Sequence, residues 1–205
     1  MFAEQYDREE TSIPPAGDSS GFVTVEKHSP GFIAFMQQHG GGMFDRGAYR
    51  LQTLSEILHG NDMVCEAFPQ YRDKVVCFGF DWLGRCFALD ATRQRDGELL
   101  VVLLEPGTGE ALKAPVTFSE FHDVELIEYP NESLATDFFE SYLTKGGAPP
   151  RRNECIGYQK PLFLGGGDTV DNLQKCDLRV YWSVNAQLLA NLRTHPNDNQ
   201  PGGDA

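Results

Sequence analysis

Four β-rich runs between Val75 and Phe118 constrain the fold of this 205-residue chain more than any other feature. VVCFGFD and RCFALDA are rich in β-branched and aromatic residues, and the short WLG segment between them predicts a hairpin. ELLVVLLEP is almost wholly apolar, which indicates a central strand covered on both faces. PGTG then turns the chain back into EALKAPVTF. These runs predict an antiparallel meander of about four strands.

Helix signals lie on both sides of the meander. Ser29 as a cap, Pro30 in the first turn and Gly40 past the end predict a helix over FIAFMQQH, and LQTLSEILHG predicts a second one that ends at Gly60. Three further segments are expected to be helical: SEFHDVELIEY with Ser119 as its cap, NESLATDFFESYLTKGG between Asn131 and Gly146, and DLRVYWSVNAQLLANL with Asp177 as its cap and Tyr181, Val184, Leu188 and Leu192 on one face. IGYQKPLFL reads as a strand interrupted, or kept at an edge, by Pro161. The expected fold is therefore α+β, an antiparallel sheet of about five or six strands flanked by helices.

Composition suggests one folded unit between two polar tails. We expect a disordered segment at 1–21, a single domain at 22–193 and a disordered segment at 194–205. The expected core consists of Phe78, Phe80, Phe87, Leu89, Val101, Leu103, Phe121, Phe138, Tyr181 and Leu188. No apolar run is long enough to span a membrane and the first residues do not resemble a secretory signal, which favours a cytoplasmic protein.

The net charge of −13 is concentrated in one part of the chain. The segment 114–144 contains seven acidic residues and neither Lys nor Arg. Such a surface repels nucleic acid and attracts a basic protein. A solvated face that only keeps the protein soluble is the competing interpretation. The acids expected to contact a partner are Glu120, Asp123, Glu125, Glu128 and Glu132.

The triple glycine in PLFLGGGDTVDNL suggests a phosphate-binding loop, but its neighbours do not fit one. A P-loop needs Lys and Ser or Thr after its last glycine, whereas Asp168 and Thr169 follow here. The glycines are contiguous, unlike a dinucleotide fingerprint, and no Glu closes a calcium loop at the twelfth position from Asp168. We therefore expect a structural turn with at least one glycine at positive φ.

No motif for catalysis or metal binding is present. The five cysteines form no CxxC pair, so free and mostly buried thiols are expected rather than a zinc site. GxSxG, HExxH and kinase motifs are absent. We therefore predict no catalytic, cofactor-binding or metal-ligating residue and expect that the protein is not an enzyme.

Three segments together resemble the SUKH superfamily of bacterial toxin-immunity proteins and fungal cell-wall regulators. They are CFGFDWLGRCFALD, LLEPGTGEAL leading to TFSEFHDVELI, and CIGYQKPLFLGGGDTVDNLQKCDLRVYWSVNAQLL, and SPGFIAFMQQHGGGMFDRGAYRL adds to the likeness. Within that superfamily the sequence is most similar to immunity proteins against type VI secretion DNase effectors, over roughly residues 25–192. The resemblance implies an α+β fold and a structural role for the motif residues Pro161, Gly165, Gly166, Asp171 and Asn172.

The resemblance also implies that the protein acts by binding. The first hypothesis is an immunity protein that neutralises a cognate basic toxin, a nuclease delivered by type VI secretion. The alternative is a non-enzymatic intracellular regulatory or scaffold protein. Neither hypothesis involves a cofactor, nucleic acid or membrane as a partner.

Overall fold

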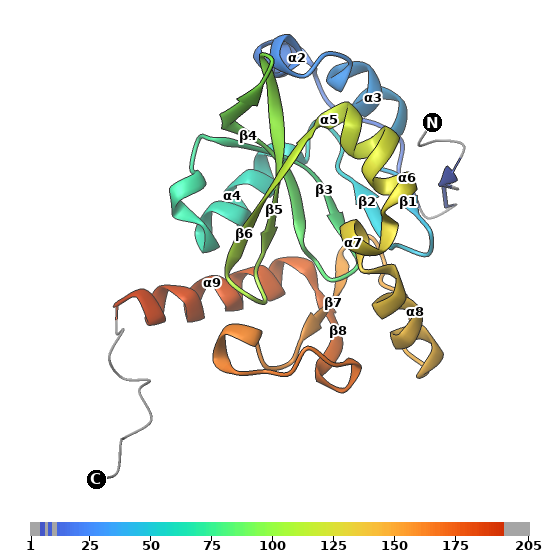
Figure 1. Cartoon of the computed structure of the whole chain (residues 1–205), viewed down its shortest axis with the longest axis vertical. Helices are drawn as coiled ribbons and strands as arrows, with labels where there is room; N and C mark the ends of the chain where they lie inside the picture. Colours follow the sequence, from blue (N-terminus) through green and yellow to red (C-terminus); the bar gives the residue numbers. More distant parts are fainter. Residues whose placement is uncertain (1–4, 7, 10–11, 195–205) are drawn as a thin grey trace.

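The computed structural model describes residues 5–6, 8–9 and 12–194, and its main element is a six-stranded antiparallel sheet in the order β1-β2-β3-β4-β5-β6 (Figure 1). The strands are β1 (Met43–Phe44), β2 (Tyr49–Leu51), β3 (Val75–Asp81), β4 (Cys86–Arg95), β5 (Glu98–Glu105) and β6 (Glu110–Thr117). A separate antiparallel pair consists of β7 (Glu154–Tyr158) and β8 (Leu173–Asp177). The predicted α+β class and the four-strand meander are confirmed, whereas β1, β2 and β8 were not foreseen.

Helices cover both faces of the main sheet (Figure 1). They are α2 (Val23–His28), α3 (Phe32–His39), α4 (Ile57–Ala67), α5 (Phe118–Glu120), the π-helical turn η3 (Phe121–Glu125), α6 (Leu126–Glu128), α7 (Pro130–Leu134), α8 (Thr136–Thr144) and α9 (Leu178–Thr194). Short 3₁₀ turns are η1 (Ser20–Phe22), η2 (Pro69–Tyr71), η4 (Leu162–Leu164) and η5 (Val170–Asn172).

Three hydrophobic clusters hold these layers together. The first packs α3, α5 and η3 on one sheet face around Phe78 and Phe87, and the second packs α4 and α9 on the other face around Phe80 and Val102. The third surrounds Trp82 and joins α8 to the β7–β8 pair. Eight of the ten predicted core residues are buried, and the exceptions, Phe138 and Leu188, are half-buried because the next residues, Phe139 and Leu189, face the core instead.

Several expected helix ends were wrong. Gly31, with φ of 85°, precedes α3, and the Glu26 carboxylate accepts the first amides of that helix, so Ser29 is not its cap. The helix expected to end at Gly60 instead begins at Ile57 and continues to Ala67. The helix expected over 131–146 is broken into α7 and α8 at Ala135, whose φ is 51°.

Part of each segment that was predicted to be a disordered tail lies outside the described residues. Of the second segment, residues 195–205 all lie outside them. Described residues of the first segment contact the folded part. Tyr6 is buried and its hydroxyl donates to the Leu126 carbonyl, while the Ile13 amide donates to the Gly41 carbonyl at 3.0 Å. These residues therefore pack against the folded part, and the bounds of the two expected tails stay a prediction.

Candidate functional site: an acidic ridge

The acidic segment begins with a capping box that fixes how it leaves the sheet. Thr117, the last residue of β6, accepts the Glu120 amide through its hydroxyl, and the Glu120 carboxylate accepts the Thr117 amide at 2.8 Å. Ser119, the cap expected from the sequence, is therefore not the capping residue. This reciprocal arrangement satisfies two amides that a helix start would otherwise leave unpaired.

Glu120 has partners within its own chain. Besides the Thr117 amide, its carboxylate pairs with Arg95, and these two interactions hold its pKa below its usual range. Of the five acids expected to contact a partner, Glu120 is thus the one with a structural role that the sequence did not reveal.

The π-helical turn η3 is anchored by a buried histidine. His122 is packed among aromatic rings, with Nδ1 2.9 Å from the Phe118 carbonyl and Nε2 2.9 Å from the Tyr49 hydroxyl. A carbonyl only accepts, so Nδ1 carries the proton and Nε2 accepts from Tyr49. Burial lowers the pKa of His122 to about 3, so the ring is neutral and adds no positive charge beneath the neighbouring acids.

The exposed side of this segment forms what we call the acidic ridge: Asp123, Val124, Glu125, Glu128, Tyr129 and Glu132. Asp123, Glu128 and Glu132 are exposed, and Glu125 is half-buried. Among the residues that the structure describes, none of these four carboxylates takes part in an ion pair. Val124 and Tyr129 are 38% and 46% exposed, so the ridge combines negative charge with two apolar side chains.

Two hollows adjoin the ridge at α7. One, of about 640 Å³, is lined by Pro130 of α7, by Glu9 and Asp45, and by the ion pair of Arg46 with Glu140. The other, of about 230 Å³, is mainly apolar and includes Glu125 and Glu132 at the ridge. The combination of protruding charge, exposed aromatic surface and flanking hollows is suited to docking a macromolecule, not to enclosing a small substrate.

The glycine loop forms a tight turn, with the positive φ that was expected at one or more of its glycines. Gly165 has a φ of 79°, its amide donates to the Leu162 carbonyl, and the Gly166 amide donates to the Pro161 carbonyl at 3.0 Å. These two amides point to the chain's own carbonyls, so they are not available to cradle a phosphate. Asn172 closes the loop by accepting the Lys160 amide and donating to the carbonyls of Lys160 and Gly167.

The remaining motif residue, Asp171, plays no part in that turn. It is exposed and forms an ion pair with Lys145 at 3.0 Å. An exposed pair of this kind contributes little to stability. The turn is therefore organised by Gly165, Gly166 and Asn172.

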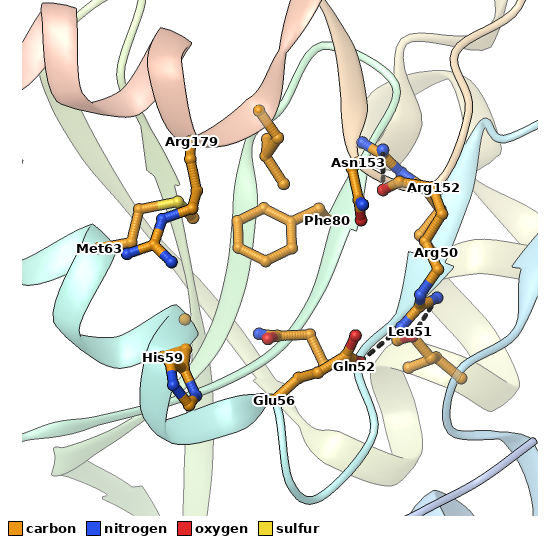
Figure 2. Close-up of a pocket in the computed structure, with 12 residues that line it drawn as sticks. Arg50, Leu51, Gln52, Glu56, His59, Met63, Phe80, Arg152, Asn153 and Arg179 are labelled. Atoms are coloured by element: carbon orange, nitrogen blue, oxygen red, sulfur yellow. Dashed lines mark hydrogen bonds and ion pairs between the residues drawn. The ribbon is translucent and has the colours of Figure 1, made fainter. Parts of the chain in front are cut away.

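A small basic pocket on the α4 and α9 side of the sheet was not found from the sequence. Figure 2 shows the Phe80 ring in its centre, with Met63 and Arg179 on one side and Arg152 on the other. Its volume is about 150 Å³. The adjacent basic residues Arg151 and Arg152 were the only sequence signal near it.

The two innermost guanidinium groups of this basic pocket have structural partners. Buried Arg50 donates to the carbonyls of Arg152 at 2.9 Å and Asp81 at 2.6 Å, and Arg152 pairs with Glu56 at 2.5 Å. Burial lowers the pKa of Arg50, although the nearby Asp81 and Glu154 side chains favour its charged form. The main effect of these bonds is to fasten the 151–154 loop to β2 and β3.

A metal centre is not evident in the described part of the chain. No group of three or more His, Cys, Asp or Glu side chains within it could hold a metal ion. The same residues include no helix with the length and apolar character needed to cross a lipid bilayer. The exposed carboxylates, the exposed Val124 and Tyr129 side chains and the two adjoining hollows make the acidic ridge the candidate functional site.

Comparison with known proteins gives a fold relative and a partial family match. No curated protein matches the chain. The crystal structure of Atu4351 from Agrobacterium tumefaciens superposes with a TM-score of 0.64 at 15% sequence identity, covering 91% of this chain and 89% of that one. This likeness concerns the fold. Residues 117–189, from the Thr117 cap through the acidic ridge and the glycine loop, match the family "T6SS immunity protein Tdi1, C-terminal", so the match covers about a third of the chain.

Proposed function

We propose that this protein is an immunity protein that binds and neutralises a cognate toxin, a nuclease effector delivered by type VI secretion. The observation that carries the proposal is that the matched segment, 117–189, contains the whole acidic ridge. The SUKH resemblance of the sequence and a cytoplasmic site of action are parts of the same proposal.

The charge of the ridge supports a basic partner. The four carboxylates of the ridge form no ion pair with any residue that the structure describes, so they repel one another, and a partner bearing Lys or Arg relieves that repulsion. A nuclease must present positive charge to the phosphates of its substrate. When the acidic ridge binds to that positively charged surface, its carboxylates take the place of the phosphates and block the binding of the substrate.

The ridge is also well prepared for binding because its backbone is fixed from beneath. The capping box holds its start, and His122 ties η3 to Tyr49 of β2. Little conformational entropy is then lost when a partner docks. Tyr129 of the ridge is 46% exposed, and Tyr is one of the residue types enriched among those that dominate binding energy.

The test pairs this full chain with candidate toxin domains taken from the genes that neighbour its own. Growth of cells that express the toxin should be restored by co-expression, and purified toxin should stop degrading plasmid DNA when this protein is added at a one-to-one ratio. Absence of protection at large excess would contradict the immunity proposal. A toxin that kills and is neutralised, yet leaves DNA and RNA intact, would contradict only its assignment as a nuclease.

A further inference from the structure

Two cysteines face each other across the small sheet. Cys155 on β7 is the register partner of Cys176 on β8, and their Sγ atoms are 3.7 Å apart. The bonds Leu178 N to Asn153 O at 2.8 Å and Gln159 N to Asn172 O at 2.7 Å show that this pair occupies a hydrogen-bonded position of the ladder. Cα atoms at such positions are about 5.5 Å apart, within the range of about 4.4–6.8 Å that a disulfide spans.

The two thiols have different surroundings. Cys155 is fully buried, close to the β3–β4 turn at Gly84. Cys176 is partly exposed and lines a hollow of about 560 Å³ together with Arg151, Arg152 and Lys175. An oxidant can therefore reach Cys176 but not Cys155.

The two thiols also differ in their pKa. The hydrogen bond from the Cys155 thiol lowers the pKa of Cys176, which outweighs the opposing effect of burial. Burial raises the pKa of Cys155 well above its usual range. This is the arrangement expected of an attacking thiolate beside a resolving thiol.

We propose that Cys176 and Cys155 form an oxidation site, at which a hydroperoxide converts the two thiols into a cross-strand disulfide. The Cys176 thiolate attacks the peroxide, the O–O bond breaks, and the leaving alkoxide takes up a proton to become an alcohol. The Cys155 thiol then loses its proton and attacks the sulfur of the resulting Cys176 sulfenic acid. The S–O bond breaks, water leaves with that proton, and two thiols plus one hydroperoxide have given one disulfide, one alcohol and one water.

The other cysteines provide an internal control. Cys65, Cys77 and Cys86 are buried in the cluster between the main sheet and helices α4 and α9. Burial raises the pKa of Cys65 to about 11 and that of Cys86 well above its usual range. All three are shielded from an oxidant by burial, so they should stay reduced while the native fold persists.

The experiment oxidises the folded full chain with a small excess of tert-butyl hydroperoxide, then alkylates it with N-ethylmaleimide in denaturant. We expect the mass of the oxidised chain, measured before alkylation, to fall by two hydrogens. Two of the five thiols should then not react with N-ethylmaleimide. Digestion should give a Cys155–Cys176 cross-linked peptide that dithiothreitol separates. The control variant Cys77→Ser should lose the same two thiols at the same rate. Alkylation of all five thiols after treatment, or a cross-link between other cysteines, would overturn the proposal.

Two single variants test the order of events. Cys155→Ser should stop at the sulfenic acid of Cys176, which dimedone traps, because no resolving thiol remains. Cys176→Ser should react at least about tenfold more slowly, because the remaining partner is buried and protonated. Equal oxidation of Cys176→Ser and the unmodified chain would show that Cys176 is not the attacking thiol, and circular dichroism of both variants establishes that they are folded.

Discussion

At the scale of single residues, the glycine loop distinguishes two glycines that the sequence treats alike. A Cβ at Gly166 would overlap the carbonyl of Lys160, whereas one at Gly167 would meet only the Thr169 side chain, at 3.6 Å or more. Gly166→Ala should therefore lower the free energy of unfolding by about 2 kcal/mol, as a forced backbone shift does, and Gly167→Ala should be almost neutral. Urea unfolding measures both, and equal stability of the two variants would contradict the loop geometry.

Gly165 offers a different test of the same loop. It has open space around it but a φ of 79°, which is costly for any residue with a Cβ. Gly165→Ala should therefore lower the free energy of unfolding by about 1 kcal/mol through backbone strain alone. Gly165→Asn, which tolerates left-handed backbone better, should recover part of that loss in the same urea titration, and a larger loss for Asn than for Ala would contradict this explanation.

Two buried titratable residues give stability opposite dependences on pH. His122 has its pKa lowered by burial to about 3, so below about pH 6.5 the unfolded chain binds a proton there that the folded chain does not. Glu105 has its pKa raised by burial to about 7, so above about pH 4.3 the unfolded chain releases a proton there that the folded chain keeps. Stability therefore falls with falling pH through His122 and with rising pH through Glu105.

The opposing effects of His122 and Glu105 on the free energy of unfolding largely cancel between about pH 5 and about pH 6.5. Removing one of the two groups should therefore change how stability depends on pH in this range. Glu105→Gln should make the free energy of unfolding rise with pH more steeply than in the unmodified chain, by about 1.4 kcal/mol per pH unit. Urea titrations at several pH values measure the difference between the two slopes. Identical slopes in both proteins would show that Glu105 does not remain protonated in the folded state.

At the scale of elements, the strand pattern of the meander was predictable and the helix boundaries were less so. β3 has the bounds that the sequence indicated, because β-branched and aromatic residues between turn signals specify a strand locally. The starts of α3 and α5 depend instead on side chains that lie outside these helices. The Glu26 carboxylate accepts an amide at the start of α3, and Thr117 at the end of β6 caps α5. The predicted apolar face of α9 was also wrong in part. Val184 is 48% exposed, because Trp182 is buried instead and donates to the Gly84 carbonyl.

The start of α5 allows the competing capping residues to be compared directly. Thr117→Ala removes the hydroxyl that accepts the Glu120 amide and should lower the free energy of unfolding by about 1 kcal/mol. Ser119→Ala, at the position that the sequence suggested as the cap, should change it by much less. Thermal unfolding of both variants decides between them, and a larger effect at Ser119 would mean that the helix starts later than the structure shows.

At the scale of the whole molecule, the sequence predicted the acidic segment but not the way it is presented. The run of acids without Lys or Arg is visible in the sequence, whereas the pairing of Glu120 with Arg95 and the hollows beside α7 require the fold. The same limit applies to the opposite side of the sheet, where Arg50 and Arg152 come from distant segments. Chain-distant contacts of this kind cannot be read from local pattern and spacing.

The last prediction concerns how the acidic ridge meets its partner. Glu128 and Glu132 are exposed and have no ion pair among the described residues, so replacing both by Gln should leave thermal stability almost unchanged. If the ridge steers a basic toxin, association should slow several-fold, and adding Asp123→Asn should bring the loss to about tenfold. The matched control is Asp62→Asn with Glu66→Gln, which removes the same number of exposed charges from α4.

Surface plasmon resonance with a toxin domain that this protein neutralises separates steering from simple solubility. For the unmodified chain the association rate should fall steeply as salt rises through about 0.15 M, where screening acts over about 8 Å, while the ridge variants should show a weaker salt dependence. The α4 variant should behave like the unmodified chain, because its lost charges lie away from the ridge. Equal association rates and equal salt dependence for the ridge and α4 variants would mean that the acids of the ridge only solvate this surface, and the toxin would then have to dock elsewhere.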